Sequence, residues 1–297
     1  MNPDPPTRSL SFVKMSGAGN DFVVLDNRNG SIGEAEKPPL ARRACRRKIG
    51  VGADGLILIE GSGAERDADY VMRYFNADGS EGELCGNGTR CAAVFAREIG
   101  AAGRSQRVAT PAGVLRADIL GGPPPGRLAA GAATVRVAMA PPGPIRRLRL
   151  SDLPGGEAEL FALEVGVPHA IEVVRDVSLV DVDRRGSAIR RHPAFPAGAN
   201  ANFIALDERA GEIHLRTFER GVEAECLACG TGATAAVTLA HRLFDWPPAV
   251  PVRVASGDRI HIDCTGDAPL MEGPVTRVFE GVFAAPPGPA DPPAEQT

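Results

Sequence analysis

The fold of this chain is decided by two glycine-rich segments, Cys85-Gly86-Asn87-Gly88-Thr89 and Cys229-Gly230-Thr231-Gly232-Ala233. An alanine-rich stretch follows each of them, and a glycine turn that leads into a strand lies 28 positions after each cysteine, at Gly113 and Gly257. Equal spacing between matched features indicates an internal duplication, which predicts two similar halves. Each half would supply one cysteine.

Most of the remaining chain has the pattern of β-strands. Short segments that are β-branched or alternate in polarity recur from Phe12 to Ile262. Helical spacing or composition is found near Leu40 to Lys48, Gly88 to Ile99 and Gly232 to Leu243. The sequence therefore predicts a strand-rich α+β protein in which each cysteine lies at a strand-to-helix turn.

The composition limits the classes of protein to which the chain can belong. Its 297 residues suffice for two ordinary domains. Charged residues make up 24% of the chain and the formal net charge is −4, so there is no basic field to bind nucleic acid or an anionic membrane. No uninterrupted apolar run of about 18 residues occurs, and the start of the chain lacks the basic and apolar stretches of a secretory signal. We expect a soluble, cytoplasmic protein that binds neither nucleic acid nor a membrane.

A cysteine at the start of a helix is chemically useful in two ways. The first N–H groups of a helix have no partner within it, and the helix dipole adds positive potential, so a carboxylate can bind there. The same field is expected to lower the pKa of a neighbouring thiol. Two such turns facing each other predict a proton transfer in which one thiolate removes an α-proton and the opposite thiol delivers one to the other face. The sequence shows no metal or dinucleotide motif, so we expect neither a metal nor an organic cofactor.

Two other interpretations of the cysteines remain open at this point. A single Cys-Gly-x-Gly segment is more often a tight turn with a buried thiol. Cys226 and Cys229 also form a C-x-x-C pair, which could be half of a zinc site or a redox pair. Against zinc, Cys85 and Cys91 are spaced differently, and nothing in the sequence places four thiols around one metal.

Several segments together resemble the diaminopimelate epimerase family. They occur in the family's order and span the chain from about Phe12 to Phe283. The matching segments are Lys14 to Phe22, Gly50 to Gly55, Phe75 to Glu81, Cys85 to Cys91, Pro168-His169, Asn200 to Phe203, Phe218 to Gly221 and Leu227 to Gly232. Proline and hydroxyproline racemase-like enzymes, which use the same mechanism on another amino acid, tend to lack the Gly-Asn-Asp-Phe and Glu-Arg-Gly segments.

The resemblance implies two pseudo-symmetric domains, each a mixed β-barrel-like sheet around a central helix, with the substrate between them. We place the N-terminal lobe at residues 9–133 and the C-terminal lobe at 134–272. Residues 273–285 could return to the first lobe, and 1–8 and 286–297 are expected to be flexible tails. The implied activity is the cofactor-independent interconversion of LL- and meso-2,6-diaminoheptanedioate, a precursor of lysine and peptidoglycan. The resemblance also suggests a homodimer.

The resemblance further assigns the residues of the site. The acid/base pair would be Cys85 and Cys229. The backbone positions that hold the reacting carboxylate would be Gly86, Asn87, Gly230 and Thr231. The residues that hold the other amino-acid end would be Asn20, Asn76, Asn200 and Arg220, with Glu219 also near the substrate. The groups that adjust the protonation of the thiols would be His169 and Glu219.

The chain departs from the family pattern at three positions. Gly55 stands where some members carry Gln, and Val167 stands where many carry Asn before the Pro-His pair. The distal end of the substrate could therefore be held differently in this chain. Cys226 stands where Thr is common, which places a third thiol close to Cys229, and we expect it to be a passive substitution.

Overall fold

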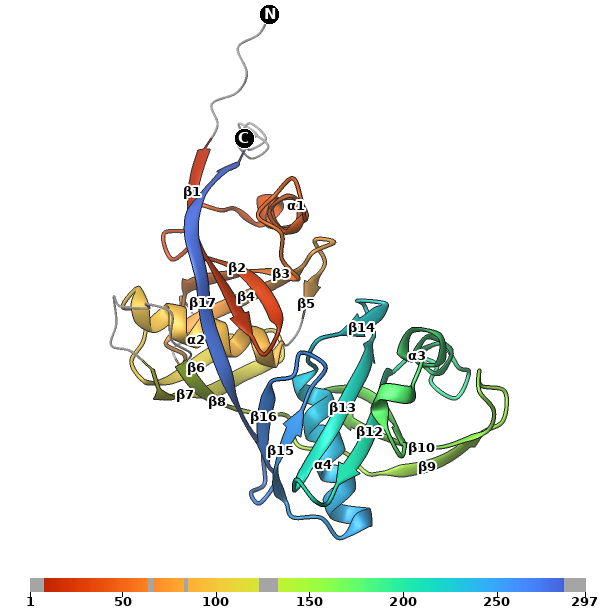
Figure 1. The fold of residues 1–297 in the computed structure, drawn as a ribbon. Coiled ribbons are helices and arrows are strands. Elements are labelled where there is room, and N and C mark those ends of the chain that lie inside the picture. Colours follow the sequence, from red (N-terminus) through yellow and green to blue (C-terminus); the bar gives the residue numbers. More distant parts are fainter. Residues whose placement is uncertain (1–7, 64–66, 83–84, 123–132, 286–297) are drawn as a thin grey trace, which may run out of the picture.

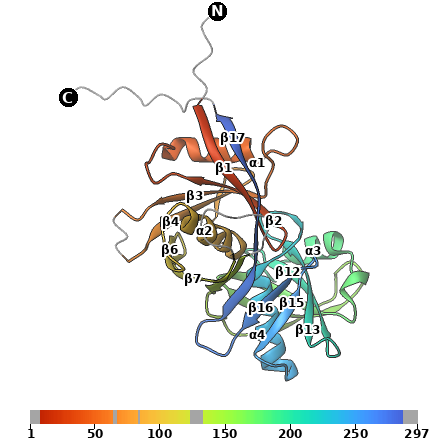
Figure 2. The same ribbon diagram turned by 60° about the vertical axis from the view of Figure 1, so that its left-hand side comes forward.

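The computed structural model describes residues 8–63, 67–82, 85–122 and 133–285, and these residues confirm the predicted α+β class. The strands form two lobes, and each lobe surrounds one alanine-rich helix, α2 (Gly86–Glu98) or α4 (Gly230–Phe244) (Figures 1 and 2). No helix in the described part of the chain combines the length and the apolarity needed to span a bilayer.

The N-terminal lobe contains the first half of the chain and the end of the last strand. Its strands are β1 (Arg8–Gly17), β2 (Asn20–Asp26), β3 (Gly55–Gly61), β4 (Tyr70–Asn76), β5 (Glu81–Gly82), β6 (Ser105–Thr110), β7 (Gly113–Gly121), β8 (Ala133–Ala138) and part of β17 (Leu270–Ala285). Its other helices are η1 (Glu34–Glu36) and α1 (Lys37–Cys45).

Eight strands of the described chain close this lobe into a ring. Hydrogen-bonded neighbours run β1-β2-β3-β4-β6-β7-β8-β17 and return to β1, with parallel pairs at β2–β3 and β4–β6. Helix α2 lies inside the ring and contacts all eight strands. Its buried residues Ala92, Ala93 and Ala96 are small enough for the strands to approach the helix from every side.

The C-terminal lobe repeats this element order. Its strands are β9 (Arg146–Leu150), β10 (Ala158–Val165), β11 (Val167–Val173), β12 (Asn200–Asp207), β13 (Glu212–Glu219), β14 (Ala224–Cys226), β15 (Ala249–Arg253), β16 (Arg259–Asp263) and the start of β17. Its other helices are η2 (Val177–Leu179) and α3 (Val182–Arg190). The neighbours run β9-β10-β11-β12-β13-β15-β16-β17, with parallel pairs at β11–β12 and β13–β15. The two halves therefore share one topology, as their equal spacing predicts.

The lobes are joined through β8 and β17. β8 pairs with β7 and with the first part of β17, whereas the residues of β17 from Thr276 onward pair with β1. Figure 1 shows β17 as a long strand that runs past both lobes. The predicted boundary at residues 133/134 falls at the first residues of β8, the strand that pairs with β7 on one side and with the start of β17 on the other. The independence of the two lobes as domains stays a prediction.

The predicted tails differ slightly from the structure. Arg8 is already part of β1 and pairs with Ala285, so the predicted N-terminal tail is one residue too long. The pairing of these two residues brings the ends of β1 and β17 together at the same end of the N-terminal lobe (Figures 1 and 2). Residues 1–7 and 286–297 lie outside the described residues.

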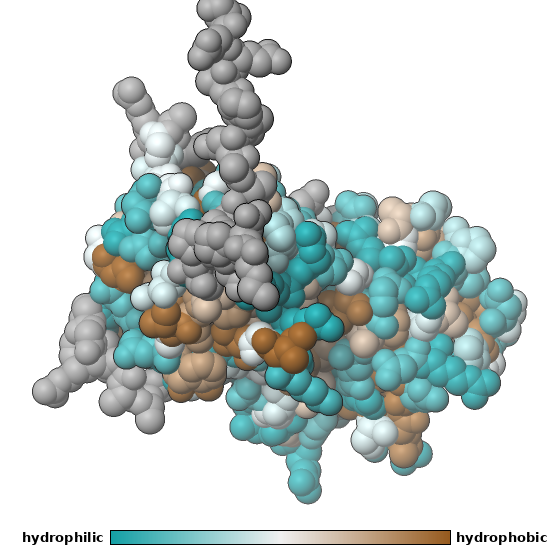
Figure 3. Space-filling model, turned by 90° about the horizontal axis from the view of Figure 1, so that it is seen from above, coloured by the Kyte–Doolittle hydropathy of each residue, from teal (hydrophilic) through white to brown (hydrophobic). Residues whose placement is uncertain are grey.

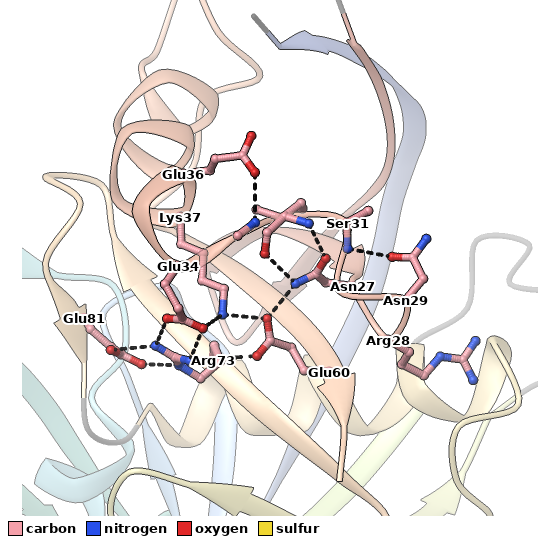
Figure 4. Close-up of polar contacts among 12 residues, drawn as sticks. Asn27, Arg28, Asn29, Ser31, Glu34, Glu36, Lys37, Glu60, Arg73 and Glu81 are labelled. Atoms are coloured by element: carbon pink, nitrogen blue, oxygen red, sulfur yellow. Dashed lines mark hydrogen bonds and ion pairs between the residues drawn. The ribbon is translucent and has the colours of Figure 1, made fainter. Parts of the chain in front are cut away.

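A buried lysine fixes α1 to the sheet of the N-terminal lobe (Figure 4). Lys37 is 2% exposed, and its ammonium group lies 2.8 Å from the Glu60 carboxylate of β3 and also pairs with Glu34. Arg73 of β4 joins the network through Glu34, Glu60 and Glu81. Because Lys37 has two carboxylates beside it, the cost of removing its ammonium group from water is offset. The network holds β3, β4 and β5 beside α1.

The turn between β1 and β2 touches the other lobe. Ala18 and Gly19 both have positive φ, and a Cβ on Gly19 would lie 2.7 Å from the Ser256 side chain and 2.9 Å from that of Leu227. Glycine is needed at position 19 because a side chain would be strained and would meet the C-terminal lobe. The two lobes are therefore in contact two residues before Cys229.

Candidate active site

Each candidate cysteine caps the central helix of its lobe. Cys85 precedes α2 and Cys229 precedes α4, both with extended backbone angles. The Sγ of Cys85 accepts a hydrogen bond from Gly88 N at 3.3 Å, and the Sγ of Cys229 accepts one from Gly232 N at 3.3 Å. The matching geometry follows from the shared Cys-Gly-x-Gly sequence. Cys85 keeps part of its surface exposed, whereas Cys229 is buried.

The two helix starts meet at the interface between the lobes. Met271 of β17 is fully buried there: a Cβ on Gly86 would lie 2.7 Å from its Cε, and one on Gly230 would lie 2.7 Å from its Sδ. The Nδ2 of Asn87 donates a hydrogen bond across the interface to the carbonyl of Ala228 at 3.0 Å. The structure thus brings together both helix starts and the residues at positions 86, 87 and 230 that the sequence assigns to carboxylate binding.

Burial controls the protonation of the two thiols. It raises the pKa of Cys85 to about 12, although the hydrogen bond from Gly88 acts in the opposite direction. Burial also raises the pKa of Cys229 to about 12; Glu219 adds to this rise, and Thr231, whose Oγ1 lies 3.5 Å from the sulfur, opposes it. The expectation of a lowered thiol pKa is wrong for this structure, because desolvation of the thiolate outweighs the field of the helix. Both thiols are protonated at neutral pH.

Glu219 ends β13 and acts on three thiols. Burial raises the pKa of its carboxyl group, and a hydrogen bond from the Cys226 thiol opposes the rise. The charge of Glu219 contributes to the raised pKa of Cys85, Cys226 and Cys229. Glu219 also contributes to the raised pKa of the buried Cys226 thiol, and the expectation that Cys226 is a passive substitution stays a prediction.

His169 is a buried, neutral imidazole in β11. It is 1% exposed, its Nδ1 lies 3.1 Å from Nδ2 of Asn202, and its Nε2 has no hydrogen-bond partner among the described residues. Burial lowers the pKa of His169 to about 3. The Oδ1 of Asn202 accepts a hydrogen bond from Thr217 at 3.0 Å, and a Cβ on Gly232 would lie 2.5 Å from the same oxygen. His169 is thus connected through Asn202 to the first turn of α4.

Asn20 belongs to the same interface. Its Nδ2 donates to Asp54 at 3.1 Å, and its Oδ1 accepts from Nδ2 of Asn87 at 2.6 Å. Asp54 in turn pairs with the exposed Arg47 at 2.9 Å. Charged residues of the N-terminal lobe therefore fix Asn20 against the first turn of α2.

Asn76 ends β4 and is oriented by two hydroxyl groups. Its Oδ1 accepts from Tyr74 at 2.8 Å, and its Nδ2 donates to Ser80 at 3.0 Å. The Tyr74 ring fills the space beside Gly55, where a Cβ would lie 2.4 Å from it. Burial raises the pKa of Tyr74 well above its usual range, and the charges of Cys85 and Glu219 add to the rise. Tyr74 therefore lies close to Cys85, and it is not among the residues predicted from the sequence.

Asn200 and Arg220 lie on the C-terminal lobe, at the adjoining ends of β12 and β13. The Oδ1 of Asn200 accepts from the backbone N–H of Arg220 at 2.8 Å, and the Arg220 guanidinium donates to the carbonyl of Ala197 at 3.2 Å. The charge of Arg220 contributes to the lowered pKa of His169. Val167, the second departure from the family pattern, pairs with Val165 in the hairpin that leads to His169.

Two further residues of the interface were not predicted. Arg90, the fifth residue of α2, is fully buried, and its Nη1 lies 3.3 Å from the Sδ of Met271. A charged residue within an alanine-rich helix is visible in the sequence. Its contact with β17 is not, because 181 positions separate the two residues.

Comparison with known proteins finds family matches over nearly the whole chain. The family model described as diaminopimelate epimerase matches residues 12–135 and 161–278. The chain is 39% identical to the diaminopimelate epimerase of Archaeoglobus fulgidus, over 92% of this chain and 96% of that protein. It is 40% identical to the diaminopimelate epimerase of Methanothrix thermoacetophila, over 93% of this chain and 96% of that protein.

Solved structures with the same fold are much less similar in sequence. A probable proline racemase from Agrobacterium radiobacter, with bound carbonate, matches with a TM-score of 0.71 and 17% identity, over 96% of this chain and 94% of that chain. A phenazine biosynthesis protein of the PhzF family from Bacillus anthracis matches with a TM-score of 0.68 and 18% identity, over 93% of this chain and 99% of that chain. These similarities concern the fold alone, and they agree with the predicted fold class.

Proposed function

Because the chain belongs to the diaminopimelate epimerase family, we propose that it interconverts LL- and meso-2,6-diaminoheptanedioate by a two-thiol mechanism that needs no cofactor. The observation that carries the proposal is that the two helix starts capped by Cys85 and Cys229, one from each lobe, lie against the same buried Met271 side chain. The repeated topology explains why the two thiols approach the substrate from opposite sides.

In the proposed reaction, Cys85 and Cys229 act on opposite faces of one α-carbon. The cysteine that is a thiolate takes the α-proton, and the cysteine that is a thiol delivers its proton to the opposite face. The configuration inverts, and the protein again holds one thiolate and one thiol with their roles exchanged. Either direction of the reaction can therefore start from the same pair of groups.

A thiol must lose its proton before this cycle begins, since burial raises the pKa of both Cys85 and Cys229. We assign the acceptance of that proton to Glu219, whose raised pKa makes its carboxylate a better base than an ordinary glutamate. Cys226 would orient this carboxylate through its hydrogen bond. The neutral His169 would keep the adjoining part of α4 in place through Asn202.

The starts of α2 and α4 would hold the reacting carboxylate. The backbone N–H groups at Gly86, Asn87, Gly230 and Thr231 belong to first turns, in which N–H groups lack partners within the helix. Both helix dipoles add positive potential at the same place. This arrangement stabilises the negative charge that moves onto the carboxylate as the α-proton leaves.

Residues from both lobes would hold the distal amino-acid end. Asn20 and Asn76 come from the N-terminal lobe, and Asn200 and Arg220 come from the C-terminal lobe. Amide groups suit an ammonium and a carboxylate together, and the arginine adds a cation for the carboxylate. Tyr74 occupies the space beside Gly55 and orients Asn76, which would compensate for an absent side chain at position 55.

The test of the proposed function is incubation of the reduced protein with LL-2,6-diaminoheptanedioate in deuterated water. We expect the meso isomer to appear with deuterium at one α-carbon, and we expect Cys85→Ser and Cys229→Ser each to abolish the conversion. Cys264→Ser is the matched control, because this thiol is partly exposed and lies at the end of β16. No exchange in wild-type protein, or full activity in Cys85→Ser, would contradict the proposal.

The same variants separate the alternative functions. A redox or zinc role centred on Cys226 and Cys229 would survive Cys85→Ser and would give bound metal or a reducible disulfide in the wild type. Epimerisation of another amino acid would appear as deuterium exchange with proline or hydroxyproline and none with the diamino substrate.

We further propose a cytoplasmic homodimer. Three large apolar side chains of β17, Val278, Phe279 and Val282, are 53%, 47% and 65% exposed. Figure 3 shows hydrophobic surface on the left-hand part of the molecule, on the side of the N-terminal lobe. Sedimentation should give a dimer, Val282→Lys should weaken it, and the control Leu179→Lys, on the other lobe, should not. A wild-type monomer at all concentrations would contradict this proposal.

A further inference from the structure

Arg90 is a buried cation next to the carboxylate-binding site. Its side chain is fully buried, and its Nη1 contacts the Sδ of Met271 at 3.3 Å. A Cβ on Gly273 would lie 3.0 Å from Cζ, Nε and Nη2 alike, so the guanidinium plane lies flat against the backbone of β17. Nε and Nη2 have no hydrogen-bond partner among the described residues.

The guanidinium remains charged in this position. Burial lowers the pKa of Arg90 to about 10, while the nearby Cys91, Cys85 and Asp258 act in the opposite direction. Cys85 caps α2, Cys91 belongs to the same helix, and Asp258 lies in the turn before β16. An isolated buried charge is unfavourable for folding, and replacing such a group by an apolar side chain is often stabilising. Stability alone therefore does not account for an arginine here.

Met271 connects this cation to both helix starts. Its Sδ touches Arg90, and its Sδ and Cε lie against Gly230 and Gly86, the first residues of α4 and α2. The guanidinium is thus one side chain away from the place where the two helices meet. Met271 also covers it, so that a substrate carboxylate at the helix starts could not form a direct ion pair with it.

We propose that Arg90 is a positioning residue that holds a permanent positive charge behind the carboxylate-binding site. The inference rests on the proposed function. The negative charge that moves onto the substrate carboxylate as the α-proton leaves would be stabilised through the low-dielectric Met271 side chain. Because Met271 separates the guanidinium from the helix starts, the charge would act without a direct ion pair to the product. Such an ion pair would slow the release of the product. The charge of Arg90 also acts to lower the pKa of Cys85.

The test compares Arg90→Met, which removes the charge and keeps an unbranched side chain, with Arg90→Lys, which keeps one charge. We expect Arg90→Met to lower kcat about 30-fold, with KM changed less than about threefold, because a charge that acts mainly on the transition state is lost. Arg90→Lys should keep kcat within about fivefold of wild type, and the urea midpoint of Arg90→Met should be unchanged or higher. Arg97→Met, on the same helix and half-buried, is the matched control and should keep wild-type kcat.

A second measurement needs no substrate. The rate at which iodoacetamide alkylates Cys85 at pH 7 should fall about tenfold in Arg90→Met and stay within about twofold in Arg97→Met. If wild-type protein does not convert the diamino substrate but alkylation still responds to Arg90→Met, the proposed function fails and the electrostatic role stands.

Three results would overturn the inference. In the first, Arg90→Met retains the wild-type kcat and the wild-type alkylation rate of Cys85. In the second, Arg90→Lys loses as much kcat as Arg90→Met. Either result would show that the positive charge of Arg90 does not contribute to the reaction. If Arg90→Met does not fold, Arg90→Gln provides the same measurements. Failure of both neutral variants to fold would show that the arginine serves stability.

Discussion

The protonation of the two thiols governs the proposed proton transfer, and it can be measured directly through the reactivity of Cys85. Burial raises the pKa of both Cys85 and Cys229 to about 12. A thiol with an ordinary pKa near 8.5 is about 3% thiolate at pH 7, whereas one with a pKa of about 12 is thiolate in roughly one molecule in 100,000. The reactive form is therefore about 10³-fold scarcer in the folded protein.

The assay is the rate of iodoacetamide alkylation of Cys85, followed by mass spectrometry in reduced, substrate-free protein. Cys85 is the better reporter because part of its surface is exposed. At pH 7 we expect alkylation to be about 10³-fold slower in folded protein than in the same protein unfolded in urea. Slow access of iodoacetamide to Cys85 could also reduce the rate, so the pH dependence is needed to distinguish this cause from a raised pKa. With a raised pKa, the alkylation rate of the folded protein should rise about tenfold per pH unit from pH 7 to 10.

A folded-state rate that levels off near pH 8 would refute this reasoning, because it would show that the helix start lowers the thiol pKa more than burial raises it. Glu219→Gln provides an independent check. Removal of this negative charge should speed the alkylation of Cys85 at pH 7, since the charge contributes to the raised pKa.

Three further predictions concern packing, ion pairs and acid stability. Gly230→Ala should abolish activity and lower stability, because the alanine Cβ would lie 2.7 Å from the Sδ of Met271. Adding Met271→Ala to this variant should restore part of the lost stability, as measured by urea unfolding. Lys37→Met should lower the unfolding free energy by about 3 kcal/mol, because it takes the nearer cation from the Glu60 carboxylate and leaves it with Arg73 at 3.8 Å. Lys37→Met with Glu60→Gln should lower it by less, and equal losses would contradict the ion-pair account. Burial lowers the pKa of His169 to about 3, whereas a histidine in the unfolded chain titrates near 6.5. The contribution of His169 to stability is therefore complete above pH 6.5. It falls by up to about 1.4 kcal/mol per pH unit as the pH drops from 6.5 toward 3. His169→Gln should remove this component from the slope of unfolding free energy against pH, and an unchanged slope would show that the imidazole is not buried in its neutral form.

Much of the fold follows from local sequence. The spacing from Cys85 to Gly113 and from Cys229 to Gly257 correctly predicts that the halves share one topology. Helices α2 and α4 begin within the Cys-Gly-x-Gly segments, as these segments predict. These features are predictable because glycine turns and helix caps depend on residues that are adjacent in the chain.

Other features depend on contacts between distant segments, and the sequence does not predict them. Helix α3 is short and polar, and it is held by packing on β12 and β13, so its own residues give little helical signal. The pairing of β8 with β17 joins the middle of the chain to its C-terminal part. The thiol pKa and the contact between Arg90 and Met271 likewise arise only when the two lobes are assembled.

The central claim is that Cys85 and Cys229 address one α-carbon from opposite sides. The most direct measurement is deuterium exchange in Cys85→Ala and Cys229→Ala, each incubated separately with the LL and the meso isomer. Neither variant should interconvert the isomers, because one of the two proton carriers is absent. Each should still exchange the α-proton that faces its remaining thiol, so the two variants should label opposite isomers at the reacting carbon. Exchange of the same isomer by both variants, or epimerisation by either, would contradict the claim.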